Sequence, residues 1–599
     1  MIDRFILASL IMMAFQLNAA SFYVSKTGND SNNGSSNSPW LTIQYAVNQL
    51  NAGDTLSVHE GIYNESITFT NSGNSINGFI VIRNIENENP VIDGTGLVQS
   101  IDYPQGLIRI FDKNYLKIIG FEIRNLITSI PNHFPAGIWI SGSSNHIELL
   151  NNSVHSIEQN GNDAGAHGIA VYGTNSTSSI NNIVIDGNEI YNCKLGWSES
   201  LVLNGNVEQF VIRNNIIRDN NNIAFDFIGH EGVCPAPEFD QARNGIVAGN
   251  TAYNIDSRGN PAYGTDASAG GIYIDGGKNI IIERNEVYNC NLGIEIASEH
   301  QNKSTSGIIL RNNFIHHNDA VGLSFGGYDE LRGITEQCFI VNNTFILNNY
   351  ENFDWGAEML MQYYCINNVI KNNIVLGSVN VPLLSDQTGT GSGNIFNYNL
   401  YYCNGLPLWE WAGLSINSFL EYQSQSTQEA NSLFSDPLFV GGNYFSPQIE
   451  EASPVKDKGE NIGNLIIGEK DFFLNSRIIG STVDIGSVEI STGTAVENEN
   501  KTANVFRMFL INYPNPFNPT TKIRYSIPIV ETHSGASVRN VLLKVYDVLG
   551  KEVATLVNEK KPAGDYEIEW NASAFPSGVY FYRLQADSFN KVMKMILTK

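Results

Sequence analysis

Several residue types are scarce in this chain of 599 residues, and each shortage excludes a class of protein. Basic residues are few, because 35 Lys and Arg stand against 60 Asp and Glu and the formal charge is −25 at pH 7. Such a charge repels polyphosphate backbones, which excludes nucleic acid as an expected partner. It also disfavours polyanionic glycans unless a bound cation bridges them. Charged residues make up 16% of the chain and hydrophobic residues 42%, a balance that argues against disorder.

Cysteine is scarce as well. The six cysteines show no Cys-x-x-Cys spacing, so the sequence gives no sign of a cysteine-based metal site. Cys193 and Cys290 close equivalent Tyr-Asn-Cys phrases, and we expect them at the same position of different structural repeats rather than paired. Buried small thiols are the favoured interpretation, and a bridge between Cys338 and Cys365 stays open for an oxidising compartment.

Long apolar runs are missing beyond the N-terminus, so no segment of the mature chain is expected to cross a membrane. At the N-terminus, Arg4 precedes an apolar run that ends at Leu17, and Ala19 and Ala20 supply small residues for cleavage. This order is typical of a secretory signal peptide over residues 1–20, with a buried N-terminal helix as the alternative. We therefore expect an exported protein.

A phrase of alternating apolar residues that ends in Asn recurs along the chain, for example as IIIERN and IILRNN. It returns about every 30 residues, the period of a solenoid with one coil per repeat, in which stacking buries the apolar face of each coil. We expect the aligned asparagines to form a ladder at a turn, where Asn tolerates unusual backbone angles and pairs its amide with the next coil. They are Asn152, Asn188, Asn215, Asn250, Asn285, Asn313, Asn343 and Asn373.

A second series of strands runs between the Asn phrases, and acidic residues appear on three consecutive members of it, NIAFDF, GIYIDG and GIEIAS. Alternation aligns Ile223 of one coil with Ile272 of the next, both facing inward. In this alignment Asp226 lies directly beside Asp275, and Glu295 lies one coil further and two residues offset. The Cα atoms of Asp275 and Glu295 are then roughly 8 Å apart. Their carboxyl groups fit the separation of about 5 to 9.5 Å used in glycoside hydrolysis.

Insertions leave the ends of these three strands, and we expect them to wall a cleft. Asp275 and Glu295 are the predicted catalytic pair, because like charges at this distance raise one pKa and keep a general acid protonated. The alternative for each is a solvated surface carboxylate. The predicted substrate-binding residues are Asp226, His230, Glu231, Tyr273, Glu299, His300, Tyr328 and Asp329.

Two stretches resemble known families. From Ser21, a strand, a turn-rich loop and a short amphipathic helix from about Thr42 to Leu50 resemble the N-terminal cap of secreted right-handed parallel β-helix proteins. That superfamily contains many polysaccharide lyases and several glycoside hydrolases. The pair GIYIDGG and GIEIASEH looks like the β-helical xylosidases, which implies Asp275 as nucleophile and Glu295 as general acid/base. Gly276 stands where that family would place a bulky aromatic residue.

The C-terminal part of the chain divides into three segments. Phrases such as SPVKDKGENIGN and DIGSVEI resemble the closing segment of exported β-helix proteins, so we expect the helix to span residues 21–490. Residues 491–504 are polar and without period, as linkers are. In residues 505–599 about seven short strands predict a β-sandwich. YPNPFNPTTKIRYSIP and the phrases after it resemble the C-terminal sorting domain of the type IX secretion system, which implies export from a Gram-negative cell or attachment to its surface.

The sequence therefore predicts an all-β protein, a right-handed parallel β-helix with an N-terminal cap, followed by a small C-terminal β-sandwich. Its predicted function is hydrolysis of glycosidic bonds in an extracellular polysaccharide or oligosaccharide by an Asp/Glu pair, which requires no cofactor. Two alternatives stay open. One is a polysaccharide lyase that holds Ca²⁺ on Asp226 and Asp275, with Lys278 close by, although the calcium-binding phrase of the β-helical pectate lyases is missing. The other is a non-catalytic glycan-binding or adhesin protein.

Overall fold

The computed structural model divides the chain into two units, Met1–Thr492 and Gly493–Lys599. The predicted signal peptide lies outside the described residues apart from Ala19 and Ala20, and the predicted linker lies outside them entirely. The structure describes residues 19–97, 105–161, 164–386, 388–490, 510–513, 517–527, 539–548, 550–561, 564–586 and 589–598.

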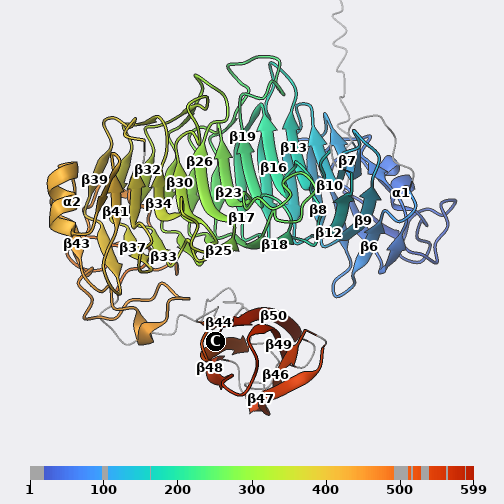
Figure 1. The fold of residues 1–599 in the computed structure, drawn as a ribbon. Helices are drawn as coiled ribbons and strands as arrows, with labels where there is room; N and C mark the ends of the chain where they lie inside the picture. Colours follow the sequence, from blue (N-terminus) through green and yellow to red (C-terminus); the bar gives the residue numbers. More distant parts are fainter. Residues whose placement is uncertain are drawn as a thin grey trace, which may run out of the picture. The chain divides into compact units, whose positions relative to one another are not determined.

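The first unit is a right-handed parallel β-helix whose three long sheets run along its length (Figure 1). Strands of the first sheet, in spatial order, are β1 (Ser21–Val24), β2 (Thr55–Val58), β5 (Ile80–Asn84), β8 (Asn114–Ile119), β11 (Asn145–Leu150), β14 (Ile180–Asp186), β17 (Val207–Arg213), β21 (Ile246–Ala248), β24 (Ile281–Glu283), β28 (Ile309–Arg311), β32 (Phe339–Val341), β36 (Val369–Lys371) and β39 (Ile395–Asn397), with β20 (Ala242–Arg243) also paired to β17. Those of the third sheet are β3 (Gly61–Tyr63), β6 (Pro90–Asp93), β9 (Glu122–Thr128), β12 (Ser153–Gln159), β15 (Glu189–Tyr191), β18 (Ile216–Asn220), β22 (Thr251–Ile255), β25 (Glu286–Cys290), β29 (Phe314–His316), β33 (Thr344–Ile346), β37 (Ile374–Gly377), β40 (Leu400–Cys403) and β43 (Leu433–Phe434).

The second sheet carries the acidic strands. Its strands in spatial order are β4 (Ile67–Thr68), β7 (Gln105–Phe111), β10 (Pro135–Ser141), β13 (His167–Gly173), β16 (Leu201–Gly205), β19 (Phe225–Ile228), β23 (Gly270–Asp275), β26 (Leu292–Ala297), β30 (Val321–Phe325), β34 (Ala357–Met361), β38 (Leu384–Asp386), β41 (Trp409–Trp411) and β42 (Leu414–Ile416). Alternate residues such as Ile272 and Ile294 face the interior and are fully buried, as predicted. A small additional sheet contains β27 (Ser304–Ser306), β31 (Ile334–Glu336) and β35 (Cys365–Ile366).

The predicted asparagine ladder is confirmed in its hydrogen bonding. Asn285 donates from Nδ2 to Val247 O at 2.9 Å and to Asn313 Oδ1 at 3.0 Å, and it accepts from Asn250 in the same way. The prediction that these residues hold the unusual backbone angles was wrong. A left-handed φ occurs one position earlier, for example 54° at Arg284. The turn conformation and the buried amide are therefore provided by two neighbouring residues.

Each end of the helix is covered (Figure 1). At the N-terminal end lies α1 (Ile43–Gln49), which begins after Thr42, whose side chain accepts a hydrogen bond from Tyr45 N. At the other end α2 (Phe419–Ser426) packs Tyr422 against Trp409, with ring centroids 5.2 Å apart and nearly parallel. A solenoid without such covers would expose an apolar cross-section.

Residues after β43 fold back along the third sheet. They include the 3-10 helix η1 (Val440–Gly442) and α3 (Asn464–Ile467). Phe439, Val455 and Ile485 pack in one buried cluster with Phe314 of β29. All six cysteines are buried and free, which confirms the expectation of unpaired small residues and leaves Cys338 and Cys365 unbridged.

The second unit is a small antiparallel β-sandwich with its own core around Ile523, Val545 and Tyr582. One sheet contains β44 (Leu510–Tyr513), β45 (Thr520–Ile527) and β48 (Gly564–Asn571); the other contains β47 (Glu552–Lys561), β46 (Arg539–Asp547), β49 (Gly578–Ala586) and β50 (Phe589–Leu597). The predicted fold class is confirmed for both units.

Candidate functional site

The outward face of the second sheet brings the acidic residues together. Its central column runs from Asp226 on β19 to Tyr273 on β23 and Glu295 on β26, each directly opposite the next. Three side chains on this face are buried, since Asp226 is 3% exposed, Tyr273 5% and Asp275 4%, whereas Glu295 is partly exposed. The alternative of solvated surface carboxylates is therefore wrong for the two aspartates.

The predicted alignment of Asp226 was wrong by two residues. Phe225, not Ile223, lies opposite Ile272, so Asp226 lies opposite Tyr273 instead of Asp275. Phe225 and Phe227 are fully buried and fill the interior at this coil. Because the side-chain period of a strand is two, a shift of two residues keeps the inward and outward faces and leaves no trace in the alternation.

Six carboxyl groups act on one another here, and we call them the acidic cluster: Glu199, Asp226, Glu231, Asp275, Glu295 and Glu299. Hydrogen bonds tie its members to the sheet. Glu299 N donates to Asp275 Oδ1 at 2.8 Å, and the Tyr273 hydroxyl donates to Glu299 Oε1 at 3.4 Å. Asn204 Nδ2 donates to Glu231 Oε2 at 2.8 Å from the neighbouring strand β16. Strands β16 to β26 thus position the cluster, and the loops after them complete it.

Burial and mutual repulsion keep protons on this cluster. Burial, followed by the Glu299 carboxylate, raises the pKa of Glu295 to about 8. Burial and the Glu231 carboxylate raise the pKa of Glu199 to about 8. The pKa values of Asp226 and Asp275 are also raised well above the ordinary aspartate value, in both cases by burial first and by neighbouring carboxylates second. At neutral pH the site therefore contains carboxylic acids that can donate a proton.

Because the folded acidic cluster holds these protons, we expect the free energy of unfolding to fall as the pH rises. Unfolded glutamate titrates near pH ~4.3, whereas Glu199 and Glu295 titrate at about 8 in the folded chain. Between these values the folded state holds protons that the unfolded state has released, so the free energy of unfolding decreases as the pH rises through this window. We expect a higher midpoint of thermal unfolding at pH 5.5 than at pH 8.5. Glu199→Gln should shrink the difference and Glu336→Gln, outside the acidic cluster, should not; an equal effect of both would contradict the prediction.

The other predicted binding residues lie at the rim of the acidic cluster. Tyr328 stacks under the Arg332 guanidinium, 4.4 Å from the ring centroid, and its pKa is raised to about 12 by burial and by Glu299. Asp329 forms an ion pair with Arg332 at 3.3 Å, so its carboxylate is engaged in holding the loop. His300 is partly exposed and acts electrostatically on His230.

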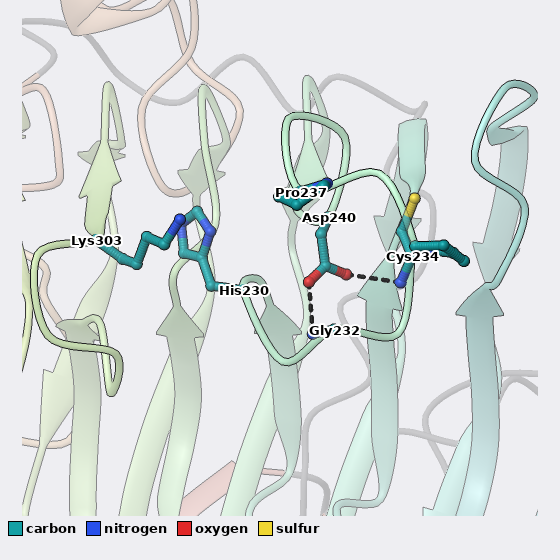
Figure 2. Close-up of a pocket in the computed structure, with 7 residues that line it drawn as sticks. His230, Gly232, Cys234, Pro237, Asp240 and Lys303 are labelled. Atoms are coloured by element: carbon teal, nitrogen blue, oxygen red, sulfur yellow. Dashed lines mark hydrogen bonds between the residues drawn. The ribbon is translucent and has the colours of Figure 1, made fainter.

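His230 lies in a separate pocket of about 230 Å³ beside the acidic cluster, which Cys234, Asp240 and Lys303 also line (Figure 2). The Asp240 carboxylate accepts hydrogen bonds from Gly232 N at 2.6 Å and Cys234 N at 2.8 Å, which shapes the loop. Burial lowers the pKa of His230, and the Lys303 ammonium lowers it further. The lowered pKa favours the neutral form of His230 at neutral pH.

Sequence reasoning missed three residues of this site. Glu199 precedes β16 by two positions, and Trp197 and Tyr263 belong to loops. The carboxylates of Glu199, Glu299 and Asp226 contribute to the raised pKa of Tyr263, which places this residue at the edge of the acidic cluster. The only available signal was their position next to the strand series, because loop residues carry no periodicity.

A metal-binding arrangement is not present among the described side chains. Asp226 Oδ1 is buried without a hydrogen-bond partner, and an oxygen of this kind is a ligand type that Ca²⁺ accepts. Yet in the part of the chain that the structure describes, no three His, Cys, Asp or Glu side chains converge to hold an ion. The residues as placed do not fit the calcium site of the lyase alternative.

Among the described residues, no helix is long and apolar enough to cross a membrane.

Two family models match the chain. Residues 22–195 match the model described as Pel9A-like, right-handed beta helix region, and residues 512–598 match the secretion system C-terminal sorting domain. Neither match includes residues 199–299, which carry the acidic cluster.

Individual proteins are similar over different lengths. The uncharacterized protein YwoF of Bacillus subtilis (strain 168) is 37% identical over 436 residues, which are 72% of this chain and 92% of that protein. Pectate lyase PEL9 of Emericella nidulans is 32% identical over 143 residues, 22% of this chain and a third (33%) of that protein. Among solved structures, pectate lyase Pel9A aligns over 79% of this chain and 96% of its own, with a TM-score of 0.38 and 14% identity. The complex of XylC with xylose aligns over 96% and 100%, with a TM-score of 0.38 and 12% identity.

Proposed function

The chain belongs to the β-helix family of YwoF from Bacillus subtilis, and from this premise we propose that it is an enzyme that hydrolyses glycosidic bonds of an extracellular polysaccharide. The observation that carries the proposal is the acidic cluster, in which Glu295 has a pKa of about 8 beside the buried carboxyl of Asp275. The C-terminal sorting domain directs the protein out of the cell through the type IX secretion system. The partners are therefore a glycan substrate and the export machinery.

Hydrolysis needs a proton donor and an ionised carboxylate on the two sides of the scissile bond. Glu295 is protonated at neutral pH and supplies the proton to the leaving oxygen. Asp275 is the proposed partner, as nucleophile or as base for water. The hydrogen bond from Glu299 N favours its ionised form, whereas burial and the nearby carboxylates oppose it. The cluster therefore shares its protons as coupled carboxyl groups do, one acting as acid while another is ionised.

The charge of the site favours a neutral sugar. A uronate would bring a further negative charge to six carboxyl groups, and the Coulomb energy of two such charges at 4 Å is about 4 kcal/mol near a protein surface. Protonation of the acidic cluster reduces this repulsion only in part. Neutral pentose or hexose polymers are therefore the proposed substrate class.

A polysaccharide lyase is the second candidate. Its support is the Pel9A-like match over residues 22–195 and the likeness to a pectate lyase over 143 residues. Such an enzyme removes a proton next to a uronate carboxylate and needs a base and a cation to stabilise the charge. Because the described side chains do not fit a calcium ion, we derive no calcium step for this chain.

The test is the product formed from a panel of neutral and uronate polysaccharides by full-length protein, with and without calcium. We expect reducing ends from a neutral polymer, no ultraviolet absorbance from unsaturated ends, and loss of release in Asp275→Asn but not in the control Glu336→Gln. Absorbance that depends on calcium would overturn hydrolysis in favour of the lyase. Binding without any cleavage would overturn both and favour a glycan-binding surface protein.

A further inference from the structure

An exposed tryptophan borders the acidic cluster on a rigid loop. Trp197, just before β16, is 53% exposed, although an aromatic ring of this size usually gains stability from burial. The backbone on both sides of it is fixed. Asn222 Nδ2 donates to Gly196 O at 3.1 Å and to Ser198 O at 2.9 Å, and Asn260 Nδ2 donates to Gly196 O at 2.8 Å. Both asparagines are fully buried, so the ring is presented at a defined position.

Tyr263 connects this tryptophan with the acidic cluster. Its ring centroid lies 5.1 Å from that of Trp197, with the planes tilted by 54°. Asn222 Nδ2, which holds the Trp197 loop, also donates to the Tyr263 hydroxyl at 3.4 Å. The pKa of Tyr263 is raised to about 12, mainly by burial and in part by Glu199, Glu299 and Asp226. Trp197, Tyr263 and the acidic cluster are therefore neighbours.

A second aromatic residue lies at the opposite end of the acidic cluster. Tyr328 follows β30 and lies under the Arg332 guanidinium, and the carboxylates of Glu299 and Glu295 act on its hydroxyl. From β16 to β30 the second sheet advances by four strand spacings, which is about 19 Å along the helix axis. That length exceeds one or two sugar rings. The acidic cluster thus lies between two aromatic edges.

We propose that the Trp197–Tyr263 pair is a binding platform for one sugar ring of a glycan chain that crosses the second sheet obliquely, past Glu295 toward Tyr328. The apolar C–H face of a sugar ring packs on a flat aromatic side chain, while its hydroxyl groups remain free to bond the carboxyl groups alongside. A loop that is already ordered loses little entropy when the sugar binds. This inference rests on the proposed function, and it adds that several sugar units are bound at once.

The consequence is a dependence on chain length. A glycan that reaches from Glu295 to Trp197 gains the platform contact, whereas a disaccharide at Glu295 does not. We expect Trp197→Ala to raise KM for a hexasaccharide about tenfold, since one aromatic contact of this size contributes about that factor. The kcat for the hexasaccharide, and both constants for the shortest cleaved substrate, should stay unchanged. Trp197→Tyr keeps a flat ring and should restore most of the affinity.

The platform is tested by calorimetric binding of disaccharides and hexasaccharides of xylan, mannan, β-glucan and homogalacturonan to the full-length Glu295→Gln protein, which removes the proposed acid. When Trp197→Ala is added to this protein, we expect its affinity for the hexasaccharide to fall about tenfold and its affinity for the disaccharide to stay unchanged. The matched control is Trp355→Ala, because Trp355 is also exposed, at 42%, and contacts Phe353 instead of the acidic cluster.

Equal hexasaccharide affinity with and without Trp197, or no binding of any series, would overturn the platform. Together with cleavage assays of the protein that retains Glu295, this experiment separates the inference from the proposed function. Hexasaccharide binding that depends on Trp197 in a protein that cleaves none of these polymers would uphold the platform and overturn hydrolysis. Cleavage that depends on Glu295 but is indifferent to Trp197 at every chain length would uphold hydrolysis and overturn the platform.

Discussion

Glu295→Gln is expected to lower kcat for the polysaccharide substrate about 10³-fold, in the middle of the range for removal of a general acid. Gln keeps the shape of the side chain but has no proton to give to the leaving oxygen. In the unmodified enzyme the activity should decline as the pH rises through about 8, because Glu295 then loses its proton. The variant should lack this limb of the pH profile.

Substrates with different leaving groups distinguish a role of Glu295 as proton donor from a purely structural role. In an aryl glycoside with an acidic phenol, the phenolate leaves without protonation. Hydrolysis of this substrate by Glu295→Gln should therefore fall far less than that of the polysaccharide. Glu336→Gln, on β31 and outside the acidic cluster, is the matched control and should retain full activity. A kcat for Glu295→Gln within a factor of three of the unmodified protein would remove Glu295 from the mechanism.

The fold was accessible from the sequence because a solenoid repeats its signals. The Asn phrases and the alternating strands recur on successive coils, so each coil supports the interpretation of its neighbours. The ladder bonds from Asn152 to Asn373 were predicted for this reason. The left-handed residue one position earlier was not, because it is Asn at some coils, as at 214, but Arg or Gly at others, as at 284 and 187.

The site could be predicted from the sequence only in part. Alternation placed Asp226, Asp275 and Glu295 on the outward face, since their faces follow from a period of two. It did not fix the register of Asp226, because Ile223, Phe225 and Phe227 alternate in the sequence and a shift of two residues leaves that alternation unchanged. Nor did it show that Asp226 and Asp275 are buried, which is the main cause of their raised pKa values. Glu199 and Trp197 lie in a loop and have no sequence periodicity.

The second large effect is expected for stability, at the buried ladder. Asn285→Ala removes two donors and an acceptor from a fully buried position. It leaves Val247 O without its donor at 2.9 Å, and it leaves Asn250 N and Nδ2 without the oxygen that they reach at 2.9 and 3.0 Å. Asn250 Nδ2 keeps its other bond, to Ile212 O at 2.9 Å. An unsatisfied buried polar group costs about 1–3 kcal/mol, so Val247 O and Asn250 N together cost about 2–6 kcal/mol. The measurement is the urea midpoint of the full-length protein.

The loss should also be local, because each coil of a solenoid contacts only its neighbours. Hydrogen exchange in Asn285→Ala should accelerate first in β21, β24 and β28, while α1 and the C-terminal sandwich keep their protection. Asn464→Ala is the matched control, since Asn464 is exposed at the start of α3. If Asn285→Ala cost no more than Asn464→Ala, the coils would be held by apolar packing alone, and the asparagine column would be a consequence of the turn rather than a source of stability. The four broken bonds to two neighbouring coils favour the larger loss, because no water can replace them at a position without solvent access.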